Sequence, residues 1–138
     1  MLYGKLIHPE ILDALARAGH GGRLLIADGN YPFSTGAPET ATRVYLNFSP
    51  GMLNVCDVLT VIKDAIPIES ALIMIPPDAE EQEIHREFKN ILNKDTAFIS
   101  KQRFDFYQDV LSASTCLVIC TGETRRFANI LLTIGVNA

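Results

Sequence analysis

GHGGRLLIAD, at residues 19–28, joins a glycine-rich turn to a short apolar run that ends in a carboxylate. The run from Leu24 to Ala27 is bounded by turn residues at its start and by a carboxylate at its end, which is the pattern of a short buried strand. His20 therefore lies at one end of the predicted strand and Asp28 at the other. Because a histidine titrates near neutral pH, an imidazole on such an open turn is a candidate for moving a proton.

Helical and extended patterns flank this strand. A helix is predicted from Pro9, which suits a first helical position, to Gly19, which suits a helix end; its apolar stripe comprises Ile11, Leu12, Leu15 and Ala16. Residues 29–42 are rich in glycine and proline and predict a long loop, which serves either a binding or an interface role. A capping box at 78–81 predicts the start of another helix.

The remaining elements follow the same alternation. Strands are predicted at 43–48, 71–75, 97–99, 116–121 and 129–133, and helices at 54–65 and 103–113. This order predicts a single α/β domain over residues 1–138, with three layers and a mostly parallel or mixed sheet flanked by helices. The last two strands are expected to be adjacent in the sheet.

Composition excludes several classes of function. The chain has 48% hydrophobic and 20% charged residues, which is typical of a globular protein. Its net charge of −4 leaves no basic surplus for a nucleic-acid partner. No apolar stretch approaches the roughly eighteen residues of a membrane span, and no signal core follows Met1. A cytoplasmic protein is expected.

Neither the cysteines nor the histidines form a metal-binding pattern. Cys56, Cys116 and Cys120 include no CxxC pair, so reduced and inert thiols are expected, with Cys116 and Cys120 on one strand face. The histidines lack ligand spacing, so no metal is expected. His8 is interpreted as local structure at a helix start, and His85 as part of a solvated helix face.

Motifs near both ends resemble the D-ribose pyranase and L-fucose mutarotase family. They are Pro9-Glu10-Ile11-Leu12, Gly19-His20-Gly21, Ala27-Asp28-Gly29-Asn30-Tyr31-Pro32, Thr121-Gly122-Glu123, Ala128-Asn129-Ile130-Leu131-Leu132 and Gly135-Val136. The likeness covers nearly the whole chain and is looser in the middle. There Arg103-Phe104-Asp105-Phe106-Tyr107 is similar to the fucose branch, since the ribose branch tends to carry a histidine at the position of Arg103.

The resemblance implies an enzyme without metal or organic cofactor that interconverts the anomers or ring forms of a free monosaccharide similar to L-fucose. It also implies a helix-covered α/β sheet and a ring-shaped homo-oligomer, often a decamer, with sites near subunit contacts. Opening a cyclic hemiacetal requires a proton delivered to the ring oxygen and another removed from the anomeric hydroxyl. A single group with a pKa near neutrality, assisted by water or a second polar group, is sufficient for this step.

The resemblance also suggests which residues act. His20 is expected to be the catalytic proton donor, and the sugar is expected to contact Asp28, Arg103, Phe127 and Asn129. Asp28 would accept hydrogen bonds from sugar hydroxyls or orient His20, or would only begin a turn before Gly29. Arg103 offers a fork of donors, and the Asn129 amide both donates and accepts.

One position departs from the family pattern. The family usually has a tyrosine where this chain has Phe127, and a phenyl ring stacks on a sugar but cannot donate a hydrogen bond. Tyr31, Tyr45 or Tyr107 would then have to supply a hydroxyl. The departure leaves two alternatives to an enzyme: a non-catalytic monosaccharide-binding protein of the same fold, and an oligomeric structural protein whose loop 29–42 serves assembly. The role of Glu123 is open between contact with sugar and ordering of its turn.

Overall fold

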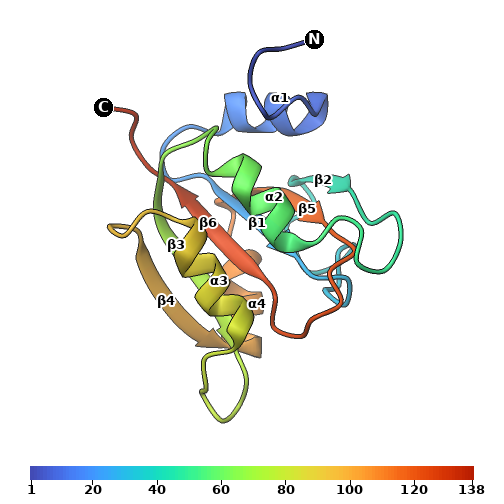
Figure 1. The fold of residues 1–138 in the computed structure, drawn as a ribbon, viewed down its shortest axis with the longest axis vertical. Coiled ribbons are helices and arrows are strands. Elements are labelled where there is room, and N and C mark those ends of the chain that lie inside the picture. The colour runs from blue at the N-terminus through green and yellow to red at the C-terminus, as the bar shows by residue number, and fades with distance from the viewer.

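Strands and helices alternate along the computed structural model, which describes residues 1–138. The elements are α1 (Pro9–Ala18), β1 (Arg23–Ala27), β2 (Thr42–Tyr45), α2 (Val55–Ile62), β3 (Ile68–Ile75), α3 (Glu83–Ile91), β4 (Ala97–Gln102), α4 (Arg103–Val110), β5 (Thr115–Cys120) and β6 (Ile130–Ile134). The strands form one sheet in the order β2-β5-β1-β6-β3-β4 (Figure 1). The predicted α/β class and mixed sheet are confirmed.

One strand runs against all the others. β1 is parallel to β5, β5 to β2, and β3 to β4, whereas β6 is antiparallel to both of its neighbours, β1 and β3. The carboxyl ends of the other five strands and the first residue of β6 therefore meet at one edge of the sheet. Small-molecule sites in α/β proteins form at this carboxyl edge.

The expected adjacency of the last two strands is wrong. β1 lies between β5 and β6 and pairs with both, in parallel with β5 and antiparallel with β6. The reason is burial, because Leu24 to Ala27 are completely buried. β1 therefore lies in the centre of the sheet, with a hydrogen-bonded strand on each side. The segment between β5 and β6 then crosses the carboxyl edge instead of forming a hairpin.

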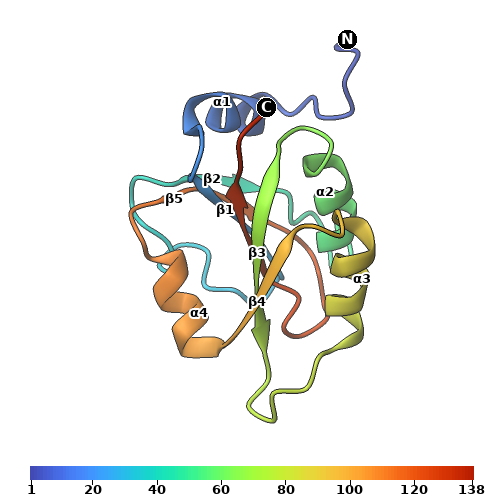
Figure 2. The same ribbon diagram turned by 90° about the vertical axis from the view of Figure 1, so that its left-hand side faces the viewer.

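Two apolar layers pack against the sheet. Figure 2 shows α4 on one side of the sheet and α2 and α3 on the other. The larger layer contains side chains from α1, α2 and α3, and includes Ile11, Leu59 and Phe88. The smaller layer is formed by α4 and the long loop, and includes Phe106 and Tyr31. No helix is of a length and apolarity that would let it span a bilayer.

A bulge in β5 overturns the expectation that two cysteines share a face. Arg23 of β1 lies opposite Thr115, but the next residue, Leu24, lies opposite Leu117, so Cys116 is the extra residue. One extra residue inverts the alternation of a strand. Cys116 therefore packs against the larger layer and Cys120 against the smaller one, where burial raises the pKa of the Cys120 thiol to about 12.

Helix ends follow local chemistry, with two differences from expectation. Gly19 caps the end of α1 with a left-handed φ of 71°, as expected, but Ala16 of the predicted apolar stripe is exposed. The N-cap of α3 is Gln82, four residues after Asp78, the predicted N-cap. The Asp78 carboxylate instead accepts from the Glu80 backbone N–H and closes a turn. The Gln82 backbone N–H donates to His85 Nδ1 at the true start of the helix.

The loop at 29–42 is ordered by one side chain. The Arg43 guanidinium donates hydrogen bonds to four backbone carbonyls of this loop, those of Phe33, Ala37, Pro38 and Ala41, at 2.7–3.3 Å. Tyr31 is buried under the same loop and donates to the Gly36 carbonyl at 2.8 Å. The loop therefore has a defined conformation that these hydrogen bonds maintain.

Replacing Arg43 with Lys tests this role. A lysine has no planar fork and cannot serve four carbonyls, so we expect Arg43→Lys to lower the free energy of unfolding by about 1–3 kcal/mol. The control is Arg17→Lys, because Arg17 makes only an exposed pair with Asp13 and should change stability by less than about 0.5 kcal/mol. Urea unfolding measures the free energy of unfolding of both variants. Equal decreases in the two variants would contradict the role of Arg43 in ordering the loop.

Candidate functional site

Two buried polar side chains pair at the carboxyl edge of the sheet. Asp28 follows β1 and Asn129 precedes β6, and only 4% and 3% of their surfaces are exposed. The Asp28 backbone N–H donates to Asn129 Oδ1 at 2.8 Å, and Asn129 Nδ2 donates to Asp28 Oδ2 at 3.0 Å. The Asn30 backbone N–H donates to the other carboxylate oxygen at 3.0 Å. The two side chains thus fix each other's orientation.

Burial and hydrogen bonding act on the Asp28 carboxylate in opposite directions. Burial raises the pKa of Asp28, whereas hydrogen bonds from the Asn30 backbone and the Asn129 amide, together with the nearby Ala128 backbone N–H, favour the charged form. The net effect is a pKa above the ordinary value. Such a carboxylate is a stronger proton acceptor than an exposed aspartate, and it is held in place to act as one.

This pair lines a cavity of about 410 Å³, which is a suitable size for a small ligand. The cavity brings together four of the five side chains predicted to act, namely Asp28, Arg103, Phe127 and Asn129. Its other lining residues are Asn30, Tyr31, Met74, Tyr107 and Arg126. The topology explains why these residues meet at one place. Some follow β1, some precede β6, and the others belong to the end of β3 or to α4, and all these segments lie at the carboxyl edge of the sheet.

The two tyrosines of the cavity differ in what their hydroxyls do. Tyr31 donates its hydroxyl to Gly36, so that group is already engaged. Tyr107 packs edge-on against Tyr31 with ring centroids 5.4 Å apart, and its hydroxyl makes no hydrogen bond within the chain. Sequence signals existed for both: Tyr31 closely follows Asp28, and Tyr107 is one helical turn after Arg103. Tyr45, the third alternative, does not line the cavity.

Two guanidinium groups in the cavity have no acidic partner. Neither Arg103 nor Arg126 makes an ion pair, and Arg103 lies over the Phe104 ring at 4.7 Å. Their donors are free to hold the oxygens of a ligand. Sequence reasoning found Arg103 and missed Arg126, whose position on the turn before β6 depends on the fold.

His20 lies outside this cavity. It precedes β1, at the amino edge of the sheet, and its half-exposed ring places Nε2 at 3.2 Å from Glu69 Oε1. The five residues of β1 alone span about 16 Å. A single chain therefore does not bring His20 to the cavity that contains Asp28 and Asn129.

Glu123 orders the turn between β5 and β6. It is 3% exposed, accepts two hydrogen bonds from the Arg125 guanidinium, and accepts from the Val55 backbone N–H at the start of α2. Burial alone would raise its pKa, but the hydrogen bonds and charge of Arg125 lower it. Arg125 also pairs with Glu87 of α3. Glu123 thus acts on the turn and does not line the cavity.

His85 is buried, which corrects its assignment to a solvated helix face. None of its surface is exposed, Nδ1 accepts from the Gln82 backbone N–H at 3.0 Å, and Nε2 is 2.9 Å from the Phe127 carbonyl oxygen. Glu83 and Arg86, the charged neighbours that suggested a solvated face, are exposed on the outer side of α3. Burial lowers the pKa of His85. His8, by contrast, is confirmed as local structure: its Nδ1 accepts from the Ile11 N–H at the start of α1.

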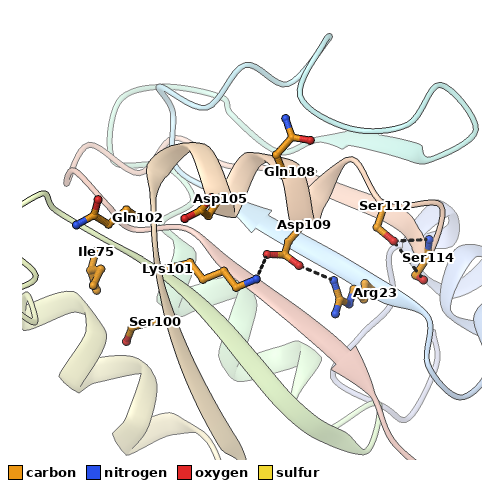
Figure 3. A pocket seen from close by; sticks show the side chains of 10 residues that line it. All are labelled: Arg23, Ile75, Ser100, Lys101, Gln102, Asp105, Gln108, Asp109, Ser112 and Ser114. Carbon is orange, nitrogen blue, oxygen red and sulfur yellow. Dashed lines mark hydrogen bonds and ion pairs between the residues drawn. The ribbon is translucent and has the colours of Figure 1, made fainter.

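A larger cavity of about 720 Å³ lies beside α4 (Figure 3). There Asp109 pairs with Lys101 at 2.5 Å and with Arg23 at 3.4 Å, as the dashed lines show. Both cations of this cavity are thus engaged by Asp109, whereas Arg103 and Arg126 of the Asp28 cavity have no acidic partner. No group of three His, Cys, Asp or Glu side chains is placed to hold a metal ion. The cavity at Asp28 is therefore the better candidate site.

Fold and site define a small α/β protein with a polar cavity of a size that suits a small molecule. The chain belongs to the RbsD / FucU transport protein family, whose sequence model matches residues 1–137. A human (Homo sapiens) protein named fucose mutarotase is 28% identical over 96% of this chain and 91% of its own length.

Solved structures agree. The fucose mutarotase from Streptococcus pneumoniae, in complex with L-fucose, is 25% identical over the full length of both chains, with a TM-score of 0.82. Bacillus subtilis RbsD, complexed with D-ribose, matches with a TM-score of 0.86 over the full length of both chains. At 22% identity this second likeness shows the fold alone. The family named from the sequence motifs is confirmed.

The buried His85 predicts a pH dependence of stability. Its pKa is lowered in the folded state, so below about pH 6.5 the unfolded chain binds a proton that the folded chain resists. The contribution of neutral His85 to the free energy of unfolding is therefore complete above about pH 6.5. As the pH falls below this value, the contribution decreases by at most about 1.4 kcal/mol per pH unit. The charged groups near His85, Glu81 and Lys89, are present both in the wild type and in a variant that lacks only the histidine, so their effect cancels in a comparison of the two.

Urea unfolding of the wild type and of His85→Gln, between about pH 7.5 and 5.5, measures this contribution. The free energy of unfolding should fall more steeply in the wild type than in His85→Gln, because glutamine does not titrate. Parallel curves would show that His85 does not remain neutral in the folded state.

Proposed function

We propose that this protein is a cofactor-independent mutarotase that interconverts the anomers of L-fucose or a closely similar free monosaccharide. The observation that carries the proposal is the cavity in which the Asp28–Asn129 pair and Arg103 converge. Its donors and acceptors suit sugar hydroxyls. Family membership and the relatives named fucose mutarotase support this reaction over other small-molecule chemistry.

The reaction requires only proton transfers. An acid protonates the ring oxygen, a base removes the proton of the anomeric hydroxyl, and the bond between the anomeric carbon and the ring oxygen breaks to give an open-chain aldehyde. Rotation and re-closure then yield the other anomer, with each proton returned. Asp28 accepts from a hydroxyl of the sugar, while the Arg103 and Arg126 guanidiniums donate to its oxygens.

His20 is proposed as the acid, supplied by a neighbouring copy of the chain. Within one chain, β1 separates His20 from Asp28, so a cavity that uses both draws His20 from another subunit. A ring-shaped homo-oligomer, such as the decamer that the resemblance implies, provides neighbours in equivalent positions. We propose this assembly and a cytoplasmic location for the protein.

Tyr107 compensates for the missing tyrosine at position 127. Its unengaged hydroxyl lines the same cavity as the Phe127 ring. Phe127 would then stack on the apolar face of the sugar, and Tyr107 would donate the hydrogen bond. If no other hydroxyl takes this role, the protein instead binds sugar without turning it over, which is the second candidate function and rests on Phe127 alone.

Saturation-transfer NMR on equilibrated L-fucose distinguishes the two functions. We expect the protein to accelerate anomer exchange above the buffer rate and Tyr107→Phe to reduce that acceleration at least tenfold. Binding without exchange, with exchange gained in Phe127→Tyr, would favour the binding protein. Absence of both binding and exchange, across a panel of free sugars at millimolar concentration, would contradict the sugar site.

Mixed assemblies test the shared site. His20→Ala and Asp28→Asn should each lose most of the activity, at least about a hundredfold. When the two inactive proteins are unfolded together and reassembled, about a quarter of the cavities should combine an intact His20 with an intact Asp28 from different chains. Recovered activity would support the shared site. No recovery, although the chains mix, would place both residues in the same chain or exclude one of them.

A further inference from the structure

The turn that carries Phe127 has an unfavourable backbone conformation. Phe127 has a φ of 59°, in the left-handed region that a bulky residue rarely adopts. It is held there between Arg126 and Asn129, all three of which line the cavity. Residues in such conformations persist only where their surroundings hold them, and they gather at functional sites. Some contact must therefore hold this turn.

The contact is made by His85 of α3. His85 Nδ1 accepts from the Gln82 backbone N–H, so the ring proton of the neutral imidazole is on Nε2. Nε2 then donates to the Phe127 carbonyl oxygen at 2.9 Å. Both ring nitrogens are engaged within the protein and the side chain is wholly buried, so His85 neither touches a ligand nor supplies its proton.

The Phe127–Ala128 peptide connects His85 to the site. In a planar trans peptide the C=O and the N–H point in opposite directions. The C=O of this peptide accepts from His85, and its N–H, on Ala128, lies near the Asp28 carboxylate and favours its charged form. One rigid group thus joins the imidazole to the carboxylate that orients the site. A rotation of this peptide would break the hydrogen bond to His85 and turn the Ala128 N–H away from Asp28.

We propose that His85 is a positioning residue of the sugar site, acting on Asp28 and on the Phe127 ring through the Phe127–Ala128 peptide. The inference rests on the proposed function for its effect on sugar, but its effect on the site's geometry is independent of any ligand. His85 has two separable hydrogen bonds, one that caps α3 and one that holds the turn. Substitutions can remove them one at a time.

Three variants separate the two bonds. Glutamine places an amide N–H near the position of histidine Nε2, so His85→Gln keeps the bond to Phe127 and loses the cap. His85→Met has a similar length and keeps neither bond. Asparagine places an oxygen near the position of Nδ1, so His85→Asn keeps the cap and loses the bond to Phe127. Phe88→Leu, a packing change on the same helix, is the control for lost stability.

Amide NMR without ligand is the first readout. The Asp28 and Ala128 backbone amides and the Asn129 side-chain amide should stay near their wild-type positions in His85→Gln and Phe88→Leu. They should move in His85→Met and His85→Asn. If one of these last two variants does not fold, the other still decides. Equal shifts in His85→Gln and the two other His85 variants, or unmoved amides in all of them, would overturn the proposal.

Titration with L-fucose is the second readout. The dissociation constant should rise by roughly tenfold or more in His85→Met and His85→Asn, and by less than about threefold in His85→Gln and Phe88→Leu, because a small misplacement of a site is costly. A merely structural role would order the variants by their stability and not by the presence of the donor. If the wild type itself fails to bind L-fucose, the proposed substrate is wrong, and the amide shifts alone still test the positioning role.

Discussion

The pairing of Asp28 with Asn129 is the constraint on which the site depends. It arises because β1 and β6 are antiparallel neighbours in the middle of a sheet whose other strands are all parallel to one another. The end of one strand and the start of the other are thereby brought together at the same edge. Both side chains are buried and satisfy each other, and breaking either bond would leave a polar group unpaired.

The remaining features support that pair from different directions. Arg43 ties down the long loop above Tyr31, and Glu123 with Arg125 orders the turn before β6. His85 holds the peptide whose N–H lies near the Asp28 carboxylate. The surroundings of the cavity are therefore fixed by contacts within the chain, while its lining residues Arg103, Arg126 and Tyr107 have donors that no other group of the chain engages. This division suits a site that must bind without large rearrangement.

Much of this could be predicted from the sequence, and the exceptions have physical causes. Periodicity found nearly every element, and the resemblance in the end motifs and in the segment at Arg103 pointed to the family and to four residues of the cavity. Strand order was not encoded locally, so β5 and β6 were wrongly paired, and one bulge residue inverted the side of Cys116. His85 looked solvated among charged neighbours because only the sheet shows which face of α3 is buried. The sequence motif placed His20 in the site, but the strand β1 separates it from the cavity that contains Asp28.

A crystal structure of the assembled protein with L-fucose tests the central claim most directly. The account predicts the sugar in the cavity between Asp28, Asn129 and Arg103, with His20 of a neighbouring subunit within hydrogen-bond reach of its ring oxygen. Sugar bound instead in the larger cavity beside α4, or bound at Asp28 with every copy of His20 facing solvent, would contradict it.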